Sequence, residues 1–307
     1  MTTETTEAAA LISLADITEI ELIILRRMKE VTLGDHRSHS HGPGFDYVGT
    51  REWQPGDGFS GIDWAQSSLT NFSPLIIREF AQPSTATVLA VADRSLSTRC
   101  GLDGVPIAAS LARAIATIGL SAVFFQDLFG LMTFDAGMKD VSVVRPRIGR
   151  SHVLHCLDAY EHQRGLQEVK YVESLSTTIA SFVRRTALIP FISDFLFDDA
   201  RSVLNELALL SSSHDTFVVL LDAAFAFQLP RVSAGWIEIY DVETGQARVV
   251  SRSEAGKMSD RIRGWQDDVA KMALDFDLDV IRIGTDSVKS DLALAEFVSE
   301  RRLRKVA

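Results

Sequence analysis

Residues 87–97 have the sequence TVLAVADRSLS, in which a run of β-branched and apolar residues leads directly into a polar segment. An uninterrupted run of this kind is typical of a strand covered on both faces, as in a parallel sheet. The stretches 187–192 (ALIPFI) and 216–221 (TFVVLL) have the same character. We therefore expect three central strands of one sheet.

Segments with helical spacing of apolar residues alternate with these strands, which predicts a mostly parallel sheet with helices on both faces. The fold class is thus α/β. The predicted helices are 106–125, 151–163, 174–185, 198–210 and 259–276, and the further strands are 128–134, 236–240 and 278–283, with 141–144 a candidate partner of 128–134.

The N-terminal part has a different composition. Residues 1–10 are rich in Thr and Glu and predict a disordered tail, and apolar spacing predicts a helix over 11–31. Glycines and isolated aromatic rings dominate 34–74, so we expect an irregular segment packed onto another surface. The expected division is a tail (1–10), an N-terminal helix with this segment (11–85), and a sheet domain with a C-terminal extension (86–307).

Composition excludes several classes of protein. With 31 basic and 41 acidic residues the net charge is −10, which disfavours non-specific nucleic-acid binding. Two cysteines, Cys100 and Cys156, exclude a disulfide framework and a thiolate zinc site. We expect no secretory signal in MTTETTEAAA and no membrane span, because the most apolar stretch, 107–125, contains Arg113 and suits a buried helix. A cytoplasmic protein is the expectation.

Ligands of open parallel sheets bind beyond the carboxyl ends of the strands. Asp93, Ser95 and Ser97 follow one predicted central strand, and Asp194 follows another. Carboxylate and hydroxyl oxygens suit Mg²⁺ or Mn²⁺ in a partly hydrated shell. The alternative is local: Ser95 or Ser97 caps the next helix, and Asp93 makes hydrogen bonds within a turn.

Several motifs together resemble the domain of unknown function 58 family. They are FDYVGTREWQPGD at 45–57 and IDW at 62–64, with DRSLS at 93–97, GDHRS at 34–38, REF at 78–80, SDF at 193–195 and DVETG at 241–245. The resemblance covers residues 11–303. It implies a von Willebrand factor A-like domain with a metal site at Asp93, Ser95, Ser97 and Asp194. The implied partner is a MoxR-type AAA+ ATPase or its client, in the assembly or maturation of other proteins.

The chain departs from that pattern at three places. Such domains usually add a threonine ligand, whereas Thr177 and Thr178 lie inside a predicted helix and Glu173 is nearer to the expected loop. Arg94 places a cation within the ligand loop. Phe225 stands where relatives tend to carry an acidic residue.

Other polar clusters are expected to be structural. His36, His39 and His41 lack a fourth zinc ligand nearby. Arg51, Glu52, Asp57 and Asp63 suit ion pairs that fasten the irregular segment better than a catalytic cluster. The basic tail Arg301, Arg302, Arg304 and Lys305 is typical of a solvated helix end.

The predicted function is therefore a non-enzymatic adaptor, in which a carboxylate of the partner takes the last position on the metal. Two alternatives remain open. One is a metal-dependent phosphatase or hydrolase that uses Asp93, although Ser95 stands where such enzymes commonly place a second acid. The other is an interaction domain without a metal.

Overall fold

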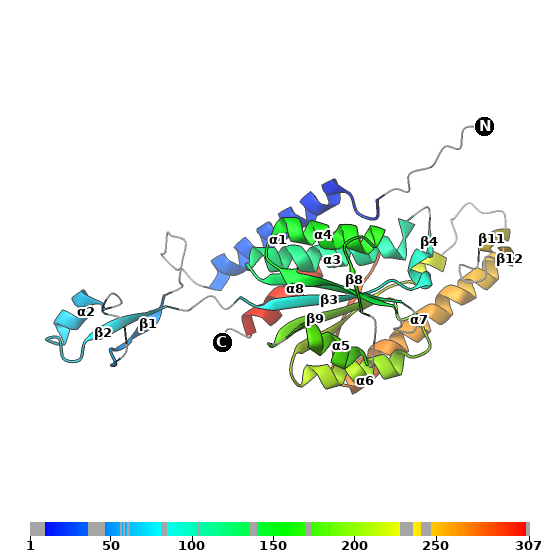
Figure 1. The fold of residues 1–307 in the computed structure, drawn as a ribbon. Helices are drawn as coiled ribbons and strands as arrows, with labels where there is room; N and C mark the ends of the chain where they lie inside the picture. The colour runs from blue at the N-terminus through cyan, green and yellow to red at the C-terminus, as the bar shows by residue number, and fades with distance from the viewer. Residues whose placement is uncertain are drawn as a thin grey trace. The chain divides into compact units, whose positions relative to one another are not determined.

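The computed structural model describes residues 10–35, 47–55, 57, 59, 62–80, 85–102, 105–135, 140–169, 174–183, 185–227, 236–240 and 247–304. They form two units (Figure 1). The larger takes in the described residues of Met1–Glu30 and Thr85–Ala307, and the smaller those of Val31–Ser84. The predicted tail at 1–9, the histidines His36, His39 and His41, and the turn at 241–245 lie outside the described residues.

The larger unit contains a seven-stranded sheet in the order β13-β10-β9-β3-β6-β7-β8. Its strands are β3 (Thr87–Asp93), β6 (Leu128–Phe134), β7 (Val141–Arg147), β8 (Gln167–Val169), β9 (Ala187–Ser193), β10 (Asp215–Leu221) and β13 (Asp279–Ile283). The five strands from β13 to β6 are parallel, and β7 and β8 add on as antiparallel strands. The prediction of a mostly parallel α/β sheet is confirmed.

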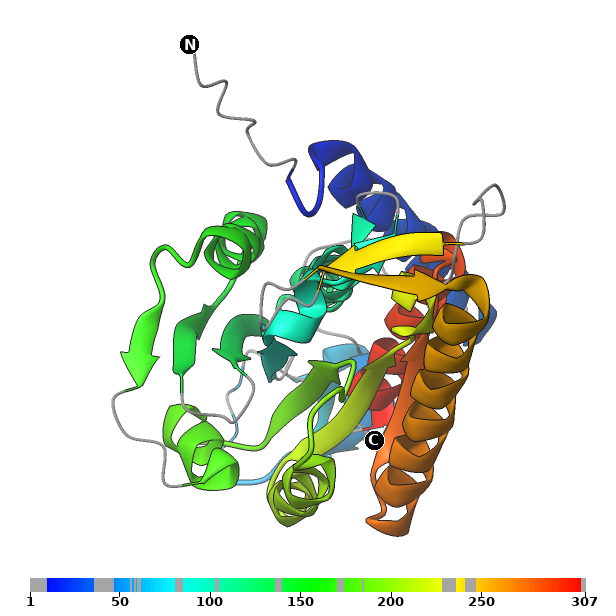
Figure 2. The same ribbon diagram turned by 90° about the vertical axis from the view of Figure 1, so that its right-hand side faces the viewer.

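Helices cover both faces of this sheet (Figures 1 and 2). One face carries α1 (Leu14–Asp35), α3 (Ile107–Phe124), α4 (Arg150–His162) and α8 (Ser287–Arg304); the other carries α5 (Leu175–Phe182), α6 (Ala200–Ser211) and α7 (Arg252–Asp275). Strand β3 supplies both cores, because successive side chains of a strand point to opposite faces. Val88, Ala90 and Ala92 pack against the first set of helices, and Leu89 and Val91 against the second.

Short elements connect the layers. They are η2 (Leu96–Arg99), β4 (Gly101–Leu102), β5 (Val105–Pro106), η3 (Ala224–Phe227), β11 (Trp236–Tyr240) and β12 (Ala247–Ser251). The last two pair as an antiparallel hairpin, and α7 follows β12 without a break. Ser251 forms a capping box with Glu254 there, so α7 begins seven residues before the predicted Ser259.

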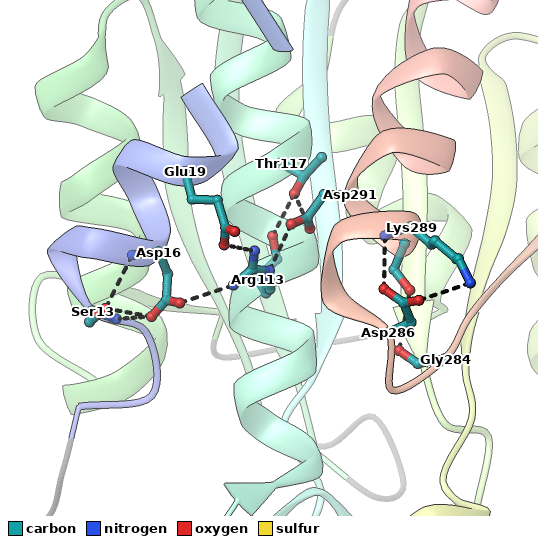
Figure 3. A network of polar contacts seen from close by, with 10 residues as sticks. Ser13, Asp16, Glu19, Arg113, Thr117, Gly284, Asp286, Lys289 and Asp291 are labelled. Carbon is teal, nitrogen blue, oxygen red and sulfur yellow. Dashed lines mark hydrogen bonds and ion pairs between the residues drawn. The ribbon is translucent and has the colours of Figure 1, made fainter. Parts of the chain in front are cut away.

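Helix α3 is buried in the first core, which confirms the prediction of a buried helix. Of the described helices it alone is long and apolar enough to cross a membrane, and 72% of its most apolar window is buried inside the unit. Its Arg113 joins three carboxylates, those of Asp16 and Glu19 on α1 and of Asp291 on α8 (Figure 3). Arg113 therefore ties α1 and α8 to the core helix.

Arg301 and Arg302 do not belong to a solvated helix end, so that prediction was wrong for these two residues. Arg301 is 9% exposed and forms ion pairs with Asp215 and Asp279. Arg302 pairs with the buried Asp127 at 2.7 Å. These contacts fasten α8 to the end of the sheet opposite the ends where Asp93 and Ser193 lie.

The smaller unit is more regular than predicted. β1 (Tyr47–Glu52) and β2 (Ile76–Phe80) pair antiparallel, and α2 (Trp64–Leu69) begins at Asp63, whose carboxylate caps it. Three of the four predicted ion-pairing residues form ion pairs inside this unit: Asp57 pairs with Arg51 at 2.7 Å, and Asp63 pairs with Arg78 at 2.8 Å. Both arginines are partly exposed, and Glu52 is exposed, so these ion pairs are only partly buried.

Candidate functional site

The predicted site lies where the order of the strands reverses direction. From β3 the chain crosses to β6 through α3, and from β9 it crosses to β10 on the other side through α6. β3 and β9 are neighbours, so their connections leave on opposite faces of the sheet. Ligands of open α/β sheets bind at such a switch point. Asp93 ends β3, and Asp194 directly follows the last residue of β9.

Asp93 is fully buried, and both of its carboxylate oxygens accept hydrogen bonds. The Ser193 hydroxyl donates to Oδ2 at 2.6 Å, and the Ser95 amide donates to Oδ1 at 2.8 Å. The Tyr160 hydroxyl on α4 donates to the main-chain oxygen of Asp93 at 2.9 Å. The carboxylate is thus held by two hydrogen bonds, and the main chain of Asp93 by a third.

Ser95 and Ser97 place their hydroxyl oxygens 2.9 Å apart at the start of η2. Ser95 is 4% exposed and stands at the N-cap of η2, but its side chain makes no capping hydrogen bond. The alternative in which Ser95 caps the helix is therefore wrong. The turn hydrogen bond expected of Asp93 does form, through the Ser95 amide.

Asp194 is fully buried and only half satisfied. Its Oδ1 accepts the Leu196 amide at 2.9 Å, while Oδ2 is buried without a hydrogen-bond partner. Buried oxygens without a hydrogen-bond partner are few in folded proteins, and one explanation for them is that the oxygen binds an ion. The four predicted residues therefore come together, with one oxygen free to accept.

The electrostatics of the pair are unfavourable without a cation. Burial raises the pKa of Asp93, against the lowering effect of the Ser193 hydroxyl and the Ser95 amide. Burial and the charge of Asp93 raise the pKa of Asp194 to about 7, although the Leu196 amide and the Ser97 hydroxyl act against them. Burial first, and then the two carboxylates, raise the pKa of Tyr160 well above its ordinary value. A bound cation would reverse this effect on both acids.

The departures seen in the sequence have clear positions. Thr177 and Thr178 lie in α5, and each hydroxyl donates to the main-chain oxygen of Ser174. Arg94 is part-exposed, and its charge lowers the pKa of the nearby Tyr160. Phe225 lies in η3, packed against the first core. Within the part of the chain that the structure describes, no three His, Cys, Asp or Glu side chains gather as a metal-binding group. Hydroxyls must therefore supply part of any ligand set here.

Four residues of the site were missed from the sequence. Ser193 and Tyr160 hold Asp93, and Trp265 and Gln266 of α7 hold the main chain at Asp194 and Phe195. Ser193 belongs to the SDF motif and precedes Asp194 directly, which is a signal that was available. The other three have no local signal, because they lie 67 to 72 residues away along the chain from the residues that they contact.

The family model of "Protein of unknown function DUF58" matches residues 49–264, a stretch that includes both carboxylates of the site. The chain belongs to this family. The match runs from β1 of the smaller unit to the middle of α7, and so covers most of the motifs that carried the resemblance, from Gly49 of the 45–57 motif to DVETG at 241–245. Among curated proteins none matches this family member.

Three solved structures are distantly similar to this DUF58 protein. The conserved hypothetical protein BatB from Bacteroides thetaiotaomicron is 14% identical (TM-score 0.41) over 71% of this chain and 98% of its own. An aerotolerance-related membrane protein from Bacteroides fragilis is 16% identical (TM-score 0.41) over 70% of this chain and 99% of its own. The pilus adhesin SpaC from Lactobacillus rhamnosus GG is 10% identical (TM-score 0.41) over 73% of this chain and 31% of its own. Likeness at this level carries no argument about function.

Proposed function

We propose that this DUF58 protein is a non-enzymatic, cytoplasmic adaptor built on a von Willebrand factor A-like domain. Asp93, Ser95, Ser97 and Asp194 would hold Mg²⁺ or Mn²⁺, and a protein partner would supply a further oxygen ligand. The family resemblance suggests a MoxR-type AAA+ ATPase or its client as that partner. The metal would supply a strong local positive charge for gripping a carboxylate.

One observation carries the proposal: Asp194 Oδ2 is buried without a partner beside a second buried carboxylate. Folding alone gives no reason to place two acids of raised pKa together at the end of a sheet. The paired hydroxyls of Ser95 and Ser97 add neutral oxygens at the same point. Two carboxylates and two hydroxyls form a hard donor set that suits either metal.

The geometry favours binding over hydrolysis by Asp93. A carboxylate that attacks phosphorus needs an oxygen open to the substrate. Both oxygens of Asp93 accept short hydrogen bonds, and the residue is fully buried. We therefore expect no phosphatase activity with p-nitrophenyl phosphate and Mg²⁺. Magnesium-dependent turnover that Asp93→Asn abolishes would overturn the adaptor proposal.

Calorimetry with MgCl₂ and MnCl₂ tests the metal site directly. The wild type should bind at one site, and Asp194→Asn should lose that binding. Asp222→Asn is the matched control, because Asp222 follows β10 at the same edge and accepts the Ala224 amide as Asp194 accepts that of Leu196. Absence of binding by the wild type would favour an interaction domain without a metal.

Affinity purification tests the adaptor role. The wild type should retain its partner in Mg²⁺ and release it in EDTA, and Asp194→Asn should fail to retain it in either buffer. Equal retention in all conditions would exclude binding through a metal.

A further inference from the structure

We infer that Trp265 and Gln266 of α7 are positioning residues that set the geometry of Asp194, so that the position of α7 regulates the site. The inference rests on the proposed function in one respect, namely that Asp194 binds a metal. It concerns two adjacent residues on a helix that otherwise packs against the second core through Val269 and Ala273.

Gln266 is 3% exposed and spans the ends of two strands. Its Nε2 donates to the main-chain oxygens of Asp194 at 2.9 Å and of Leu221 at 2.6 Å. Its Oε1 accepts the Ala223 amide at 3.3 Å. The last ladder pair between β9 and β10 is Ser193 with Leu220, so the amide bridges the strands one residue beyond that pair. A side chain thus continues the ladder where the backbones separate.

Trp265 acts on the next peptide unit. Its Nε1 donates to the main-chain oxygen of Phe195 at 2.7 Å. α7 therefore holds the carbonyl oxygens of two consecutive residues, Asp194 and Phe195, with two consecutive side chains. Loss of such a donor costs free energy, because the carbonyl oxygen is left without a hydrogen bond. We therefore expect the loop at 194–195 to move together with α7.

Phe195 needs this support because its backbone is unusual. It has φ of 55° in the left-handed region, where non-glycine residues are uncommon, and its ring is fully buried. Such conformations persist only where the surroundings over-determine them, and they gather at functional sites. The turn brings the Leu196 amide onto Asp194 Oδ1, which leaves Oδ2 as the unpaired oxygen.

The helix that makes these contacts follows an outer element of the fold without an intervening loop. α7 runs on from the β11–β12 hairpin, seen in yellow in Figure 2, through the capping box at Ser251. A displacement of the hairpin would therefore move α7, and with it the two carbonyl groups at the site. Such a coupling would pass from the capping box along the helix to the hydrogen bonds of Trp265 and Gln266.

The test compares three variants on α7. Gln266→Met keeps the length of the side chain and removes its donors, and Trp265→Phe removes Nε1–H and keeps an aromatic ring. Ser259→Ala is the matched control: Ser259 is buried and donates to the main-chain oxygen of Ala224 at 3.2 Å, and no hydrogen bond joins it to 194–196. Mn²⁺ affinity is measured from the EPR signal of the free ion.

We expect Gln266→Met to weaken Mn²⁺ binding about tenfold, within the range of typical coupling between sites, and Trp265→Phe about threefold, just below that range. Ser259→Ala should leave the Mn²⁺ affinity unchanged even if it lowers the Tm as much as Gln266→Met or Trp265→Phe does. Equal affinity in all variants would overturn the inference and leave the proposed function standing.

A second measurement decides the question if the wild type binds no Mn²⁺, an outcome that would overturn the proposed function instead. Hydrogen exchange in EDTA at the amides of Phe195 and Leu196 should speed up about tenfold in Gln266→Met and not in Ser259→Ala. Unchanged exchange at these two amides would overturn the positioning role itself.

Discussion

Replacing Asp194 with asparagine is expected to stabilise the metal-free protein at pH 8, because it removes a buried acid whose pKa is raised by burial and by Asp93. In the unfolded chain the carboxyl ionises near 3.8, and in the folded protein at about 7. Between these values the unfolded state releases its proton while the folded state keeps it. The free energy of unfolding of the wild type therefore falls as pH rises through this window.

The difference between about 7 and 3.8, at about 1.4 kcal/mol for each pH unit, sets an upper limit of about 4 kcal/mol. Water that enters once Asp194 ionises relieves part of the cost, so we expect a gain of roughly 2 kcal/mol. Any effect of the asparagine amide itself is the same at all pH values. The advantage of Asp194→Asn over the wild type should therefore be small at pH 4 and grow up to about pH 7.

Urea denaturation in EDTA at pH 4, 6 and 8 measures this. Addition of Mg²⁺ at pH 8 should reverse the order, because a ligand that binds only the folded state stabilises the wild type alone. Asp127→Asn is the contrasting control, since it removes a buried carboxylate that Arg302 contacts at 2.7 Å, and it should destabilise the protein at pH 8. A difference between Asp194→Asn and the wild type that does not grow with pH would refute the reasoning.

Three further predictions concern the rest of the larger unit. Arg113→Met should cost about 3–5 kcal/mol in urea denaturation, because it leaves Asp291 buried without its ion pair, and Arg113→Met with Asp291→Leu should recover more than half. Burial raises the pKa of the Cys156 thiol to about 12, so its thiolate fraction at pH 8 should be about a thousandfold below that in the urea-unfolded chain; comparable labelling by a thiol reagent would contradict this. Gly119→Ala should lower the free energy of unfolding by about 1 kcal/mol, because the new Cβ would lie 2.7 Å from Val153 Cγ1, a clash that outweighs the gain in helix propensity; a stabilised variant would show that α4 yields.

The central strands could be predicted because a strand buried on both faces is an uninterrupted run of apolar residues in the sequence. The run 87–92 differs from β3 by one residue, and 128–134 coincides with β6. Helix α8 was not predicted. Its buried Leu294, Ala295 and Val298 lie in a short stretch, LALAEFV at 292–298, with Asp291 before it and Glu300 after it. Arg301 is buried because Asp215 and Asp279 pair with it from elsewhere in the chain. The contact between Arg301 and Asp215 joins residues 86 positions apart, so no pattern in the neighbouring sequence predicts it.

The same distinction separates the site residues that were predicted from those that were missed. Asp93 and Asp194 could be found because each follows an apolar strand, and a parallel sheet brings the ends of its strands to one edge. Tyr160 and Gln266 reach the site from the helices that cover the two faces of the sheet. Their positions depend on how helices pack, which the spacing of apolar residues does not specify. Sequence therefore located the acids, and only the structure shows what holds them.

What holds them also explains why two acids can share a buried edge. Each hydrogen bond to Asp93 favours its ionised form, and Asp194 keeps one oxygen without a partner. A fold under selection for stability alone would replace either acid with a neutral residue, since buried like charges oppose each other. The metal that we propose would offset this cost when it binds. The two buried acids thus lower the stability of the metal-free protein at the position where a bound cation would be stabilised by them, as expected where function and stability conflict.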